Sequence, residues 1–110
     1  MSCAIIYVTF QNKEYATAIA KILVTEKIVA CANIIDKMTS IYLWNDKLEE
    51  NVEVLMIAKT TKVQIENAIL RIKQLHKYEC PCIVTLDITG GNVGYINWIK
   101  NSVYLNIKVE

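Results

Sequence analysis

Strand-type and helix-type patterns of apolar residues alternate along this chain, and their order constrains the fold more than any other feature. Continuous or alternating apolar runs predict strands at residues 3–10, 27–35, 39–44, 47–60 and 82–89. Apolar residues at helical spacing predict helices at residues 13–26, 62–76 and 92–103. Asn12 is a suitable N-cap for the first helix. The order is therefore strand, helix, two strands, helix, strand and a final helix.

The two middle strands are expected to form one long hairpin. Asn45-Asp46 separates residues 39–44 from residues 47–60 and is typical of a tight turn. Asp36-Lys37 interrupts the preceding apolar run, where we expect a break or a bulge. The resulting βαββαβ order predicts an α+β, ferredoxin-like fold: an antiparallel four-stranded sheet with helices on one face and an additional C-terminal helix. The length fits a single domain spanning residues 1–110.

Most of the predicted strands are apolar on both sides. In the first strand, Ile6 and Val8 alternate with Ile5 and Tyr7. An antiparallel sheet with one face in water should instead alternate apolar and polar residues. The chain has no further elements to cover a second apolar face, so we expect a homo-oligomer that packs sheet face against sheet face.

Charge and hydropathy exclude several classes of partner. The formal net charge is +1 and no basic block occurs, which argues against a nucleic-acid partner. No apolar run approaches the roughly 18 to 20 residues of a membrane span, and the N-terminal residues do not resemble a signal peptide. We therefore expect a cytoplasmic protein that has neither a nucleic-acid nor a membrane partner. Known catalytic motifs are not found, which favours a protein that is not an enzyme.

One short motif concentrates the reactive side chains. The stretch "QLHKYECPCIVTL" holds the only histidine, His76, together with Cys80 and Cys82. It could form a soft-metal site, a redox pair or the start of a buried strand. Cys80 and Cys82 share strand parity with the apolar Val84 and Leu86, so we interpret them as packing residues. Cys31, which lies within an apolar strand, is interpreted in the same way.

Six segments together resemble the CutA family of divalent-cation tolerance proteins. They are "YVTF", "ACANI", "SIYLWNDKLEE", "EVLMIAKT", "LHKYECPCI" and "GNVGYINWI". The resemblance covers residues 4–103 and implies a homotrimer in which long hairpins cross between subunits. It also implies a role in the binding or tolerance of a divalent cation, and copper is the ion expected first. The family is structurally similar to the trimeric PII signalling proteins, which bind nucleotides and effectors between subunits.

The resemblance suggests particular site residues. Members of the family that are proposed to bind copper have a cysteine on the first strand and two neighbouring histidines. In this chain the cysteine and the second histidine are replaced by Val8 and Leu75, so His76 is the candidate metal ligand that remains. The ligand-binding candidates, which match family positions near the subunit boundary, are Trp44, Lys59, Tyr78 and Glu79. Two alternatives remain open. One is a PII-like sensor that binds a small anionic metabolite or nucleotide, and the other is a structural trimer that supports a protein partner.

Overall fold

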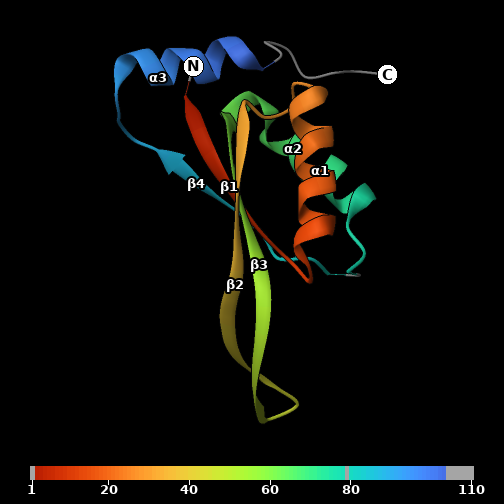
Figure 1. Cartoon of the computed structure of the whole chain (residues 1–110). Coiled ribbons are helices and arrows are strands. Elements are labelled where there is room, and N and C mark those ends of the chain that lie inside the picture. The colour runs from red at the N-terminus through yellow and green to blue at the C-terminus, as the bar shows by residue number, and fades with distance from the viewer. Residues whose placement is uncertain (1, 79, 104–110) are drawn as a thin grey trace.

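The computed structural model of the chain describes residues 2–78 and 80–103. Its elements are β1 (Cys3–Phe10), α1 (Lys13–Thr25), β2 (Cys31–Trp44), β3 (Lys47–Thr61), the 3₁₀ turn η1 (Lys62–Gln64), α2 (Ile65–Leu75), β4 (Ile83–Ile88) and α3 (Val93–Ser102). The predicted α+β order with a C-terminal helix is confirmed (Figure 1).

The sheet is antiparallel, and its longest strands form the predicted hairpin. The strand order is β2-β3-β1-β4, so β2 and β4 are the edges. Asn45 and Asp46 have φ angles of 51° and 62°, and this pair of positive values is typical of a type I′ turn. The pairing register shifts between Ile35 and Met38, which confirms the expected irregularity. Beyond it, the β2–β3 hairpin projects well past the rest of the sheet (Figure 1).

The predicted strand at residues 27–35 begins later than the sequence pattern indicates. Lys27 has a φ of 59°, a left-handed conformation that ends α1, and its N–H donates to the carbonyl of Val24. Ile28 and Val29 then pass through the core as a buried link, and β2 starts only at Cys31. The apolar residues at the start of this run are therefore explained by burial of the link, and not by pairing in the sheet.

The main core lies between the sheet and two helices. Even-numbered residues of β1 and β3, such as Ile6, Val8 and Met56, are fully buried against α1 and α2. Leu23 and Ile72 supply the helix side of this layer. In Figure 1, α1 and α2 lie together on one side of the sheet, whereas α3 crosses one end of it.

The opposite side of the sheet, here called the open face, carries the odd-numbered residues of β1 and β3 and their neighbours. α3 covers one end of it, where Cys3 packs with Ile99. The apolar side chains beyond that end stay accessible: Ile35, Val84 and Leu86 are 49%, 50% and 53% exposed. The strands are thus apolar on both sides, and within one chain the second side is uncovered.

Candidate functional site

His76 is buried where α2 ends, at the centre of an aromatic cluster. The residue caps the helix with extended backbone geometry and is 7% exposed. Its ring stacks on Phe10, with centroids 4.6 Å apart and planes inclined by 17°. The rings of Tyr15 and Tyr78 contact it at centroid distances of 5.9 Å and 4.8 Å. The Tyr15 hydroxyl donates to the carbonyl of Leu75, so this cluster joins the end of α2 to β1 and α1.

Both nitrogens of the His76 ring make hydrogen bonds to backbone. Nδ1 accepts from the Tyr78 N–H at 3.1 Å, which places the proton on Nε2, and Nε2 donates to the Thr9 carbonyl at 2.8 Å. The predicted metal role would require one of these bonds to break, since a metal needs a nitrogen lone pair. Val8 and Leu75 stand at the two other ligand positions of the family, and their hydrocarbon side chains carry no donor atom. Val8 is fully buried and Leu75 packs against the core.

The hairpin and the segment after α2 enclose a hollow of about 620 Å³, here called the hairpin hollow. Its lining consists of Tyr42, Trp44, Glu49, Tyr78 and Cys80. Trp44 and Tyr78, two of the predicted ligand-binding residues, thus lie on the same hollow. Pairing of Tyr42 with Glu49 across the hairpin brings a carboxylate to this aromatic lining.

The hairpin hollow contains both donors and acceptors of hydrogen bonds. Burial raises the pKa of the Tyr78 phenol above its ordinary value, and Glu53 and Tyr42 raise it further. The phenol therefore remains protonated at neutral pH and can donate. The side-chain amide of Asn51 donates to the Tyr42 hydroxyl and holds that ring in place. Glu49 supplies a carboxylate and Cys80 a thiol. This mixture could bind a cation or a small polar ligand.

Lys59 lies in a second hollow, here called the α3 hollow, of about 270 Å³. It is lined by Ile5, Lys59, Ile88, Gly90, Gly91, Asn92, Tyr95, Ile96 and Ile99. The Lys59 ammonium donates to the Asn33 side-chain oxygen at 2.9 Å. It also lies 4.0 Å from the Cys31 sulfur and 5.7 Å from the centre of the Tyr95 ring. An ammonium beside an apolar wall suits the charged end of an amphipathic anion.

Cys31 is not the simple packing residue that its sequence context suggests. It is half-buried, and its sulfur lies 3.5 Å from the Tyr95 hydroxyl. This contact raises the pKa of Tyr95, with a smaller contribution from burial, while Lys59 lowers it. In the structure, Cys31 pairs with Lys59 on the open face. The strand pattern identified Cys31 only as a residue of an apolar strand, and it could not show that Lys59 and Tyr95 of α3 lie beside it.

The structure separates the predicted site residues within one chain. Trp44 and Tyr78 line the hairpin hollow, Lys59 lines the α3 hollow, and Glu79 lies outside the described residues. The sequence analysis missed Glu49. A two-residue turn at Asn45-Asp46 fixes the hairpin register, so counting outward from it would have placed Glu49 beside the aromatic residues.

The structure also corrects the interpretation of Cys80 and Cys82, since both are exposed. The sequence pattern treated them as part of a buried strand, but β4 begins only at Ile83, and the open face beside them is uncovered in one chain. Among residues 2–78 and 80–103, no group of three or more His, Cys, Asp or Glu side chains could hold a metal ion.

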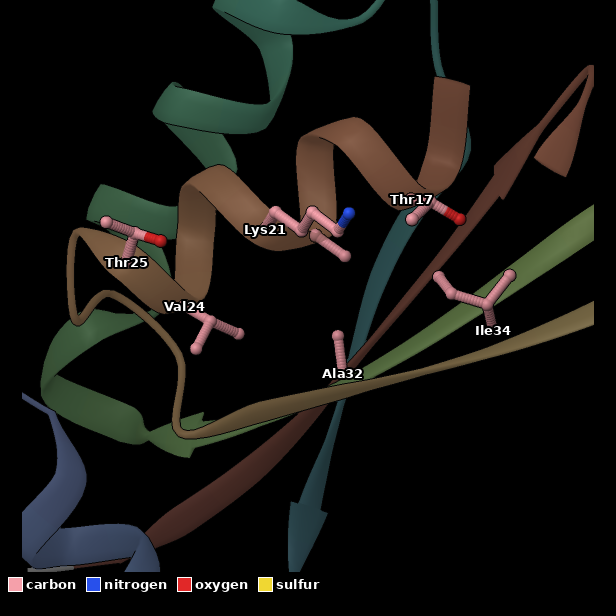
Figure 2. A pocket seen from close by; sticks show the side chains of 7 residues that line it. Thr17, Lys21, Val24, Thr25, Ala32 and Ile34 are labelled. Carbon is pink, nitrogen blue, oxygen red and sulfur yellow. The ribbon is translucent and has the colours of Figure 1, made fainter. Parts of the chain in front are cut away.

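A third hollow, of about 320 Å³, lies between α1 and the outer edge of β2. Figure 2 shows Ala32 and Ile34 of β2 pointing toward Lys21 and Val24 of α1. The lining is mainly apolar, and Lys21 is the charged group among the described residues that form it. Trp44, Lys59, His76 and Tyr78 do not line this groove, and we assign no ligand to it.

The fold and site define a class of protein: a βαββαβ domain with a projecting hairpin, an uncovered apolar sheet face and two hollows beside that face. Residues 4–102 match the model of the family described as CutA1 divalent ion tolerance protein. The chain therefore belongs to the CutA1 divalent ion tolerance family, as the sequence resemblance implied.

Individual relatives support this assignment. The divalent-cation tolerance protein CutA of Thermus thermophilus is 39% identical over 98 residues, which cover 89% of this chain and 95% of that protein. The chloroplastic protein CutA 1 of rice is 37% identical, and the match covers 89% of this chain but 55% of the relative. The chain thus spans about half the length of that plant relative. The crystal structure of CutA1 from Ehrlichia chaffeensis superposes with a TM-score of 0.89 at 36% identity, covering 94% of this chain and 97% of that chain.

Proposed function

We propose that this protein acts in divalent-cation tolerance as a homotrimer that binds a divalent cation, with copper(II) as the first ion to test. The observation that carries the proposal is the match to the CutA1 family over residues 4–102. The Thermus relative bears the same functional name. The family is named for cation tolerance and not for a catalysed reaction. We also propose a cytoplasmic location, which the sequence predicts, although the rice relative is named as chloroplastic.

The hairpin hollow is the proposed cation site. Glu49 contributes the carboxylate oxygen, while Tyr42 and Tyr78 supply phenol oxygens around it. A divalent cation bound by one carboxylate would be held weakly, because several more donors must complete its shell. The described part of the chain contains no closed donor set, so further donors from a neighbouring subunit are part of this proposal. Exposure of the open face supports such an assembly.

A second candidate function is a PII-like sensor of a small anionic metabolite or nucleotide. The α3 hollow favours it, because the Lys59 ammonium lies beside an apolar wall that includes Ile5 and Ile96. His76 is too enclosed by backbone bonds to join such a ligand in the same chain. A third candidate, a trimeric scaffold for a protein partner, requires neither hollow to be filled.

Two variants should separate these candidates in a thermal-shift and calorimetric titration. If the proposal is right, copper(II) or zinc binds the wild type, and Glu49→Gln weakens that binding by about tenfold or more, since Glu49 is the carboxylate among the described residues that line the hairpin hollow. Lys59→Met is the matched control, because it changes a charge in the other hollow and should leave cation binding unchanged.

The same titration is repeated with ATP as an anionic probe. If the wild type binds ATP, and if Lys59→Met abolishes this binding while Glu49→Gln retains it, the sensor function would replace the cation-binding function as the proposal. If neither the cations nor ATP bind, both candidates fail and the scaffold is favoured.

A further inference from the structure

The outer edge of β2 lies beside an apolar groove. The strand order β2-β3-β1-β4 leaves this edge without a partner strand among residues 2–78 and 80–103. An edge strand offers unpaired N–H and carbonyl groups to another strand. The hollow of about 320 Å³ between α1 and this edge, here called the α1–β2 groove, has Val24 on one wall and Ala32 and Ile34 on the other (Figure 2). A strand that paired with β2 here would bury one row of side chains in the groove.

The residues that follow α3 have the sequence pattern of a strand. Residues 104–110, "YLNIKVE", lie outside the described part of the chain and beyond the residues that match the CutA1 family. From Leu105 onward, apolar and polar residues alternate, which is typical of a strand with one buried side. A strand with this sequence would carry Leu105, Ile107 and Val109 on one side and Asn106, Lys108 and Glu110 on the other. Its apolar side would need a surface to cover it.

Val103, which precedes this segment, lies next to the start of β2. Its side chain is 6% exposed and packs in a cluster with Cys3, Ala30 and Ile99. Ala30 directly precedes Cys31, the first residue of β2. In Figure 1, α3 crosses the end of the sheet from the β4 side to the side where α1 lies. The segment after Val103 therefore begins close to the end of the groove at which α1 ends and β2 starts.

The length of the segment also fits the groove. The path along β2 from Ala30 to Ile34 is four residues, or about 13 Å in a strand. The seven residues 104–110 span about 23 Å when extended, which is enough to reach the far end of the groove. Because β2 also runs away from Ala30, a strand that starts here and follows the groove would be parallel to β2.

We propose that residues 104–110 pair with the outer edge of β2 at residues 31–35 and place Leu105 and Ile107 in the α1–β2 groove. The apolar side of the segment then meets a mainly apolar lining, and its polar side falls on the side of the exposed Asn33. Attachment to the end of α3 favours this segment over a second copy of the chain, since a tethered segment has a high effective concentration. The inference does not rest on the proposed cation function, because the groove shares no lining residue with the hairpin hollow.

Hydrogen–deuterium exchange followed by mass spectrometry tests the proposal on the full chain and on a chain that ends at Val103. The amides of residues 31–35 that point away from β3 should exchange about tenfold more slowly, or slower still, in the full chain, since a hydrogen-bonded amide exchanges only when its bond opens. The amides of β1 should exchange alike in both chains, which shows that the shortened chain is folded. Equal exchange of residues 31–35 in two folded chains would overturn the proposal.

Two substitutions at adjacent positions provide a matched pair in the full-length chain. Ile107→Asp places a carboxylate on the apolar side of the segment and should raise the exchange of residues 31–35 to the rate of the uncovered edge. Asn106→Asp introduces the same carboxylate on the polar side and should leave the exchange as in the wild type. If the two variants exchange alike, the apolar side does not hold the segment in the groove and the assignment is wrong. This pair decides the question even if the shortened chain does not fold.

A mixed assembly distinguishes docking within one chain from docking between copies. The chain that ends at Val103 is labelled with a heavy nitrogen isotope and refolded together with an excess of the unlabelled full chain. If each segment docks on its own chain, residues 31–35 of the labelled chain should exchange as fast as they do without the full chain. Slow exchange in the labelled chain would show that a second copy covers this edge, and the proposed docking within the chain would be wrong.

Discussion

Replacing Leu86 by glutamate is expected to dissociate the protein into monomers. Leu86 is 53% exposed on the open face, on the edge strand β4, where it pairs with Ile5 of β1. Burying such a side chain contributes roughly 1.5 to 3 kcal/mol per subunit, and burying an unpaired carboxylate in its place costs several more. Sedimentation velocity at micromolar protein should show a trimer for the wild type and a monomer for Leu86→Glu.

Leu70→Glu provides the control for this experiment. Leu70 is 58% exposed on α2, in the helix layer on the other side of the sheet, so the same change there should leave the trimer intact. If Leu86→Glu sediments as the wild type does, the open face is not the interface. A wild type that is itself a compact monomer would contradict the interpretation of the two-sided strands.

Much of the fold could be predicted because local patterns and tertiary packing agree. The turn at Asn45-Asp46 determines the hairpin register, and the helical stripes identify the faces of α1 and α2 that pack on the sheet. The start of β2 could not be predicted. Ile28 and Val29 are buried in a link, and burial selects the same residue types in a link as in a strand.

The candidate site was less predictable, since it depends on contacts between distant segments. Strand parity correctly placed Val84 and Leu86 on one face, but their exposure depends on whether another subunit covers that face. The contact of Tyr95 with Cys31 spans 64 residues, and no periodic pattern records it. His76 was recognisable as the only imidazole, but its two backbone partners become visible only in three dimensions.

Replacing His76 by alanine is expected to lower the free energy of unfolding by about 3 kcal/mol, because it removes a buried aromatic ring and two hydrogen bonds. The ring contributes its stack on Phe10 and the bonds to Thr9 and Tyr78. Urea unfolding should be compared at one protein concentration, since subunit association adds to the measured stability. The neighbouring Lys77→Ala is the control: its ammonium contacts the Tyr15 ring from the surface, and it should change the stability by less than about 0.5 kcal/mol.

His76→Phe separates the structural role of this residue from a metal role. Phenylalanine keeps the stacking on Phe10 but leaves the Thr9 carbonyl and the Tyr78 N–H without their partner, so the stability should fall between those of the wild type and the alanine variant. Its copper(II) or zinc response should persist, because the two ring nitrogens are already occupied by backbone. A folded His76→Phe protein that loses cation binding would show that His76 exchanges a backbone partner for the metal. If His76→Ala lowers the free energy of unfolding by less than about 0.5 kcal/mol, as a substitution at a surface position does, the stabilising role proposed for His76 would be wrong.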